Sequence, residues 1–91
     1  MKILIIIPAY NEGPRIGEVV RQVRDAVPDY DVLVIDDGSR DETPQAARSA
    51  GAQVVSHPFN LGYGVAIQTG YKYALAKKYD FVVQMDGDGQ H

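Results

Sequence analysis

The segment ILIII at residues 3–7 is a continuous aliphatic run that stops at Pro8. Such a run, without alternating polar residues, is typical of a parallel strand that is covered on both faces. Comparable short apolar runs recur at residues 32–35, 52–55 and 81–85. The sequence therefore predicts four buried strands.

The gaps between these runs carry helical patterns. In the first gap Pro14 suits the first turn of a helix that is expected to end near Pro28. The apolar residues of this helix recur at a spacing of about 3.6 residues, and they are Ile16, Val19, Val20, Val23 and Val27. In the second gap we expect Asp41 or Thr43 to cap a short helix that Gly51 terminates.

The third gap carries an apolar stripe that predicts another amphipathic helix. The stripe consists of Ile67, Tyr71, Ala74 and Leu75. Gly70 lies inside this pattern and indicates close packing of the backbone. Strands that alternate with helices imply right-handed crossovers and a parallel sheet. We predict an α/β fold with a Rossmann-like three-layer arrangement, in which four strands alternate with three helices.

Composition narrows the classes of function. The net charge is -3 with acidic and basic residues interspersed, so no basic stripe indicates binding to nucleic acid. Cysteine is absent, which excludes disulfides and thiolate metal sites and favours a cytoplasmic location. No run approaches the roughly 20 apolar residues that span a bilayer. In a longer parent protein the location would be the cytoplasmic face of a membrane.

Oxygen ligands follow the last apolar run. In an extended backbone Asp86, Asp88 and Gln90 project to the same side because they share parity. Two carboxylates and an amide suit Mg²⁺ or Mn²⁺, which commonly keep open positions for phosphate oxygens. The alternative is a solvated glycine-rich turn, but the position at a strand tip favours a metal that holds a phosphorylated substrate.

Polar clusters also follow the first two strands. Asp37, in the sequence DDGS at residues 36–39, has an acceptor for a nucleobase N–H, although this motif alone favours a turn with a helix cap. Tyr10 has a ring that can pack near a base and Glu12 has oxygens for ribose hydroxyls, although Asn11 and Glu12 alone favour the start of a helix. Together the clusters after strands one, two and four predict a ligand site at one edge of the sheet.

Two other features favour structural roles. The sequence NLGYG at residues 60–64 has glycines that let a backbone approach a ligand, but it lacks the lysine of a phosphate-binding loop, so a structural turn is favoured. His57 precedes Pro58, and we expect it to be a solvated loop residue. His91 is the last residue of this sequence and receives no interpretation.

Four segments jointly resemble the family 2 glycosyltransferases of the GT-A fold, nearest to the dolichyl-phosphate mannosyltransferase-like group. They are IIIPAYNE at residues 5–12, VIDDGSRD at 34–41, NLGYG at 60–64 and MDGDGQH at 85–91. By this resemblance the nucleotide is held by Pro8, Tyr10, Glu12, Ile35 and Asp37, and the metal, Mg²⁺ or Mn²⁺, by Asp86, Asp88 and Gln90. Gly87 would let the backbone lie close to the donor.

The resemblance implies an inverting enzyme that uses a UDP- or GDP-linked sugar as donor. A divalent cation stabilises the charge on the leaving diphosphate, and a general base deprotonates the acceptor hydroxyl. That base is expected beyond His91, so residues 1–91 are interpreted as the nucleotide-sugar-binding part of a GT-A domain, which binds donor without turnover. A polyprenyl phosphate is one acceptor that fits the resemblance.

Two other classes of protein remain open on the residues alone. A non-catalytic module would act through self-association, as a homo-oligomer, or through a partner that covers an exposed sheet edge. A phosphoacceptor receiver domain also places an acidic pair beside a parallel sheet. It fits poorly, because its acidic pair should follow the first strand and its lysine-bearing later strand is missing.

Overall fold

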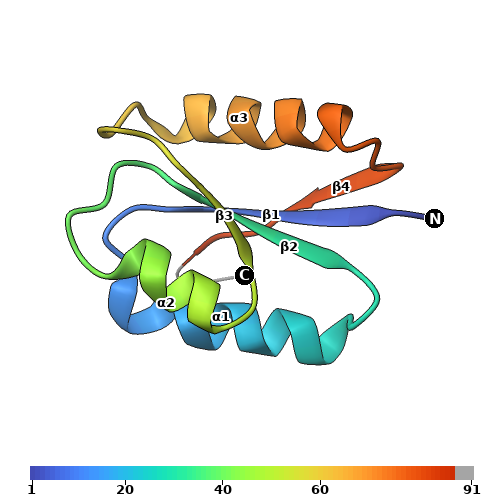
Figure 1. The fold of residues 1–91 in the computed structure, drawn as a ribbon, viewed down its shortest axis with the longest axis horizontal. Helices are drawn as coiled ribbons and strands as arrows, with labels where there is room; N and C mark the ends of the chain where they lie inside the picture. The colour runs from blue at the N-terminus through green and yellow to red at the C-terminus, as the bar shows by residue number, and fades with distance from the viewer. Residues whose placement is uncertain (88–91) are drawn as a thin grey trace.

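The computed structural model describes residues 1–87 and forms three layers (Figure 1). The elements are β1 (Ile3–Ala9), α1 (Gly13–Ala26), β2 (Asp31–Asp36), α2 (Thr43–Ser49), β3 (Gln53–Ser56), α3 (Tyr63–Ala76) and β4 (Phe81–Gln84). This order confirms the predicted alternation of strands and helices. Each predicted strand lies within two residues of the observed bounds at either end.

The four strands form one parallel sheet in the order β3-β2-β1-β4. β1 is central, with Ala9 level with Asp36 on one side and Ile6 level with Gln84 on the other. α1 and α2 cover one face of the sheet and α3 covers the other (Figure 1). The predicted Rossmann-like α/β architecture is therefore confirmed.

Both faces of the central strands are buried, which explains their continuous aliphatic sequence. Ile5 and Ile7 of β1 pack against the face that carries α1 and α2, while Leu4 and Ile6 pack under α3. Leu4, Ile6 and Ile7 have no exposed surface. Because successive side chains of a strand point to opposite faces, only a run that is apolar at every position fills both halves of the core.

The predicted start of α2 was wrong. Its N-cap residue is Glu42, whose side chain makes no capping hydrogen bond. Asp41 and Thr43 instead bond to each other and to the start of α1. Gly51 follows the helix with φ of 103°, a left-handed conformation that favours glycine and fits the predicted terminator.

The predicted apolar stripe of α3 was also partly wrong. The buried residues of this helix are Ala66, Gly70 and Ala74, whereas Tyr71 is 42% and Leu75 80% exposed. A Cβ at Gly70 would lie 2.6 Å from Cδ1 of Ile6, which confirms the predicted close packing. α3 therefore contacts the sheet through its smallest side chains. None of the helices described in residues 1–87 has the length and apolarity to cross a bilayer.

Candidate functional site

The candidate site lies at the carboxyl ends of β1, β2 and β4. The Asp37 N–H, just after β2, donates to the Ala9 carbonyl of β1 at 2.9 Å, and the Met85 N–H, just after β4, donates to the Ile6 carbonyl at 2.9 Å. β2 and β4 therefore lie on either side of β1; β2 ends level with Ala9, whereas β4 ends level with Ile6, three residues earlier along β1. Ligands of open α/β sheets bind at this edge.

A cavity of about 190 Å³ opens at this edge. It is lined by Pro8, Ala9, Tyr10, Asp37, Asn60, Gly62, Tyr63 and Ala66. Three predicted nucleotide residues, Pro8, Tyr10 and Asp37, thus meet in one cavity although two different strands position them. Tyr10 and Tyr63 are 46% and 58% exposed, so the cavity carries aromatic surface that a planar base can cover.

Asp37 is the most heavily bonded side chain of the cavity. Its Oδ1 accepts from Nδ1 of His57 at 2.8 Å and from the Leu61 N–H at 3.0 Å. Its Oδ2 accepts from the Gly62 N–H at 2.9 Å and from Nδ2 of Asn60 at 3.1 Å. Burial alone raises the pKa of Asp37, but the hydrogen bonds from His57, Leu61 and Gly62 and the charge of His57 outweigh it and hold this pKa below 3.8.

The expectation that His57 is a solvated loop residue was wrong. Its side chain is only 9% exposed. Besides the contact with Asp37, Nε2 of His57 lies 2.8 Å from the hydroxyl of Thr69 in α3. The partners of His57 lie 20 and 12 residues away in the sequence, so no local pattern indicated them. In the sequence, the one indication of a role for His57 was its position directly after β3.

The neighbouring aspartate, Asp36, has a structural role. Its Oδ1 accepts from the Ser39 N–H at 3.0 Å and its Oδ2 from the hydroxyl of Ser56 in β3 at 2.8 Å. The side chain is 3% exposed. Asp36 thus fixes the turn after β2 and ties this turn to β3, while Asp37 faces the cavity.

The loops after β1 and β2 are bonded to each other. The Asn11 N–H donates to the hydroxyl of Ser39 at 2.9 Å, and Oδ1 of Asn11 accepts from the Arg40 N–H at 2.9 Å. Asn11 has φ of 51°, a left-handed conformation that asparagine tolerates better than most residues. These bonds fix the loop that carries Tyr10 against the loop that carries Asp37.

The start of α1 depends on the same pair of loops. The Gly13 N–H donates to Oδ2 of Asp41 at 3.0 Å, and the Glu12 N–H donates to the hydroxyl of Thr43 at 2.9 Å. The Thr43 hydroxyl in turn donates to Asp41. The hydrogen bond from the Thr43 hydroxyl lowers the pKa of Asp41, and the backbone N–H groups of Thr43 and Gly13 lower it further. Together these bonds outweigh burial, which raises the pKa, and hold it below 3.8. Asp41 and Thr43 thus satisfy amides of α1, the helix before their own.

Two predicted nucleotide residues do not line the cavity. The Glu12 carboxylate lies 2.6 Å from the Arg15 guanidinium and is 16% exposed. Ile35 has no exposed surface and packs in the core beneath α3. A nucleotide could therefore contact Ile35 only through its main chain. It could bind the Glu12 carboxylate only while this group also contacts the Arg15 guanidinium. Both roles stay predictions.

Asp86 and Gly87 follow β4 at the same edge. Gly87 is buried, and a Cβ at this position would lie 2.9 Å from the Pro8 carbonyl oxygen. The missing side chain of Gly87 thus lets the chain after β4 pack on the end of β1. Asp86 is exposed beside it, so its carboxylate lies at the same end of the sheet as the cavity.

The predicted metal ligands are only partly described. Asp88 and Gln90 lie outside residues 1–87, and within that range no group of three or more potential ligands among His, Asp and Glu gathers as a metal site. Asp86 is a hard oxygen donor on the edge where phosphates would bind, which fits Mg²⁺ or Mn²⁺. The three-ligand arrangement itself stays a prediction.

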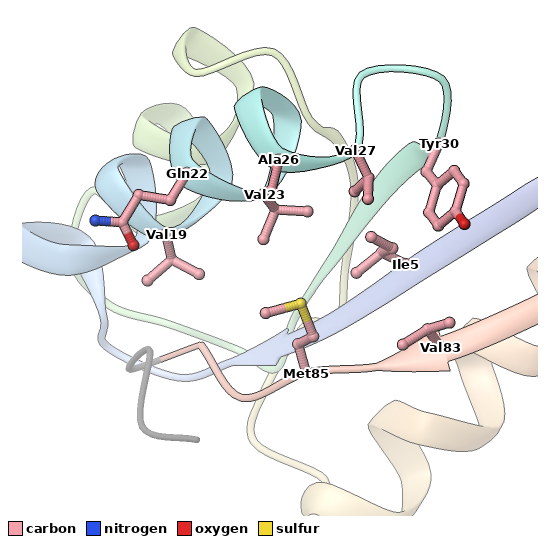
Figure 2. Close-up of a pocket in the computed structure, with 9 residues that line it drawn as sticks. All are labelled: Ile5, Val19, Gln22, Val23, Ala26, Val27, Tyr30, Val83 and Met85. Carbon is pink, nitrogen blue, oxygen red and sulfur yellow. The ribbon is translucent and has the colours of Figure 1, made fainter.

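A larger, apolar cavity of about 350 Å³ lies between α1 and the β1–β4 side of the sheet. Figure 2 shows Val19 and Val23 of α1, Ile5 of β1, Val83 of β4 and Met85, which directly follows β4, around this cavity. Tyr30 and Val27 line one end. The cavity lacks carboxylates and basic groups, so it does not offer the chemistry of a phosphate site.

Comparisons with known proteins place this geometry in a family. The pattern of the family described as glycosyl transferase family 2 matches residues 4–91. An undecaprenyl-phosphate mannosyltransferase from Micrococcus luteus is 40% identical, over 100% of this chain and 40% of its own length. The chain therefore spans about two fifths of that curated relative.

Solved structures show the same fold. A mannosyltransferase from Pyrobaculum calidifontis in complex with GDP-Man and Mn²⁺ matches 96% of this chain and 27% of its own, at 27% identity and a TM-score of 0.84. A glucosyl-3-phosphoglycerate synthase from Mycobacterium tuberculosis, with Mn²⁺ and UDP-glucose, is 31% identical over 94% of this chain and 33% of its own, with a TM-score of 0.75. The chain belongs to glycosyl transferase family 2.

Proposed function

We propose that this chain binds the nucleoside diphosphate of a sugar donor, together with Mg²⁺ or Mn²⁺, as the donor-binding part of an inverting glycosyltransferase. The observation that carries the proposal is the cavity in which Pro8, Tyr10 and Asp37 meet. Relatives of the family, solved with GDP-Man or UDP-glucose and Mn²⁺, support it. We assign donor binding, rather than turnover, to the described residues.

The cavity suits a nucleoside through its aromatic walls and a polar floor. Tyr10 and Tyr63 offer ring surface, and Asp37 offers a carboxylate. The four donors of Asp37 already use about all the acceptor positions of a carboxylate. A base N–H that binds Asp37 therefore has to replace one donor, and the Asn60 side chain, at 3.1 Å the longest of the four bonds, is the one we expect to move.

The cation would be held by Asp86 with the predicted ligands Asp88 and Gln90. When bound, it stabilises negative charge on the leaving diphosphate. As the acceptor of the whole enzyme we propose a polyprenyl phosphate, because the Micrococcus luteus relative is an undecaprenyl-phosphate mannosyltransferase. We further propose a cytoplasmic location, which the lack of cysteine favours.

Calorimetric titration of the chain with UDP and GDP, with and without Mn²⁺, tests the proposal. We expect one nucleotide to bind and Mn²⁺ to tighten binding by roughly tenfold, or about 1.4 kcal/mol. Asp86→Asn should remove most of the Mn²⁺ effect. Asp29→Asn is the matched control and should retain the Mn²⁺ effect. Asp29 is an exposed aspartate that lies just before β2, at the opposite end of the strands from the cavity. Metal-independent binding, or none in a folded sample, would contradict the proposal.

The edge strand favours a second candidate, a module that acts by self-association. β4 lies at one edge of the described sheet, and its Phe81 and Val83 are 57% and 44% exposed. An exposed apolar edge strand is a template for pairing with another chain. Light scattering separates the candidates: a stable oligomer without nucleotide affinity supports the module, whereas a monomer that binds nucleotide supports the donor site.

A further inference from the structure

The imidazole of His57 joins two segments that build the candidate cavity. It is enclosed between Asp37, after β2, and Thr69, in the middle of α3, with both contacts at 2.8 Å. His57 does not itself line the cavity, whereas Asp37, Asn60 and Gly62 do. Any role of His57 in ligand binding therefore acts through these neighbours.

The two contacts select one tautomer of the ring. An ionised carboxylate can only accept, so Nδ1 of His57 carries the hydrogen that Asp37 receives. In the neutral ring Nε2 then accepts the hydroxyl hydrogen of Thr69. With a donor on one side and an acceptor on the other, the ring orientation is fixed, and so is the Asp37 oxygen that it contacts.

Asp37 in turn holds the loop between β3 and α3. Its carboxylate receives the main-chain N–H groups of Leu61 and Gly62, the residues that lead into α3. Gly62 is the N-cap of this helix and has φ of 103°. A Cβ at Gly38 would overlap the main chain of Phe59, so the loop after β2 and the loop after β3 also touch directly.

We propose that His57 is a positioning residue for donor binding. It holds the Asp37 carboxylate against the loop of residues 57–62 and anchors both to α3 through Thr69. This proposal rests on the proposed donor site. It adds that the cavity wall formed by Asp37, Asn60 and Gly62 is preorganised by a histidine whose side chain is 9% exposed and does not line the cavity. Preorganisation lowers the free-energy cost of ordering the wall when the ligand binds.

The variants separate the two contacts of the ring. His57→Leu keeps the bulk and removes both contacts. His57→Asn retains an N–H near the position of Nδ1 and so keeps the bond to Asp37. Thr69→Val removes the hydroxyl but keeps the shape of the side chain, whereas Thr69→Ser keeps the hydroxyl. Tyr79→Phe is the control for loss of stability alone. It removes the 2.6 Å bond to Asp31, which lies at the amino end of β2, away from the cavity.

Affinity for the nucleotide is measured by calorimetry on variants shown to be folded by NMR. We expect His57→Leu to weaken binding about tenfold, the equivalent of one lost bond to a buried charged group. Thr69→Val should weaken it severalfold, and His57→Asn should weaken it to the same degree, because both variants keep the bond to Asp37 and lose the contact between residues 57 and 69. Thr69→Ser should retain most of the affinity. Tyr79→Phe should leave it unchanged. If His57→Leu does not fold, the Thr69 pair and His57→Asn carry the test.

Imidazole ¹⁵N shifts of the ligand-free chain supply a second readout. We expect His57 to be protonated at Nδ1, with Nε2 responding to Thr69→Val. The opposite tautomer, or folded His57→Leu and Thr69→Val chains that bind as tightly as the unmodified chain, would overturn the positioning role and leave the donor site standing. An unmodified, folded chain that binds neither UDP nor GDP would overturn the donor site and the positioning role with it.

Discussion

Asp37 is the residue on which the site depends. A carboxylate that is 6% exposed is stable only because donors surround it. Four donors do so here, and all four belong to the loop between β3 and α3. The same bonds that form the cavity wall therefore also contribute to the stability of the fold.

This arrangement predicts an acid-sensitive contribution to stability. The pKa of Asp37 is lower in the folded chain than the ordinary value of 3.8, so its contribution is fully present above that value and is lost as the pH falls through the lowered pKa. We expect Asp37→Asn to lower the free energy of unfolding by about 1–3 kcal/mol at pH 7. Urea unfolding of both chains from pH 7 to pH 3 measures the difference.

The difference should shrink only below about pH 4, where the carboxylate begins to protonate in the unfolded chain. Asp41 also has a lowered pKa, but it is present in both chains and its effect cancels in the comparison. A difference that stays constant down to pH 3 would mean that the charge of Asp37 does not stabilise the fold.

For single residues, the sequence predicted where they lie in the fold better than it predicted which residues they contact. Asp37 and Asp86 were predicted at the ligand-binding edge because covalent order alone places them after strands. His57 and Thr69 were missed because their contacts join different elements, and no periodicity links a loop histidine to a helix hydroxyl. The roles of the predicted nucleotide and metal residues stay predictions until ligands are measured.

Among the elements, the strands were predicted well and the helices less so. A strand buried on both faces has an unambiguous aliphatic run, as in β1 and β2. α3 is apolar on more than one face, with Val65, Ile67, Tyr71 and Leu75 all available. Periodicity therefore did not select its buried face. The face that carries Gly70 was selected by the close approach to Ile6.

The contact of α3 with β1 makes a prediction about two glycines of the same helix. A Cβ at Gly70 would lie 2.6 and 2.7 Å from two carbons of Ile6, which has no exposed surface. The helix-propensity gain of alanine is at most about 1 kcal/mol, while overpacking costs about 1–3 kcal/mol. We expect Gly70→Ala to destabilise the chain in urea unfolding.

Gly64→Ala is the matched control. A Cβ at Gly64 would meet no atom within 4 Å, so the propensity term acts alone and we expect a gain of up to about 1 kcal/mol. If both substitutions stabilise the chain equally, α3 does not pack on Ile6 as tightly as described.

For the whole molecule, the unequal cover of the sheet is the main feature. β1 and β2 are buried on both faces, whereas Phe81, Val83 and Gln84 of β4 are exposed. The apolar cavity beside Val83 and Met85 leaves this side thinly packed (Figure 2). Regions with few buried contacts open at lower free energy than the core.

We therefore expect amides of β4 to exchange with solvent before those of β1 and β2. Native-state hydrogen exchange followed by mass spectrometry resolves the segments. The Met85 N–H, which bonds to the Ile6 carbonyl, reports on β4, and the Asp37 N–H, bonded to Ala9, is the internal reference on the other side of β1. Equal protection of the two amides would show that β4 opens only with the whole sheet.

The central place of β1 also governs the order in which the chain can assemble. Ile3 pairs with Phe81, so one side of β1 has no strand partner until the residues of β4 have been synthesised. Until then the aliphatic strand β1 is open on one side, and contacts between distant segments form slowly. That interval is when a nascent chain of this topology most needs a chaperone.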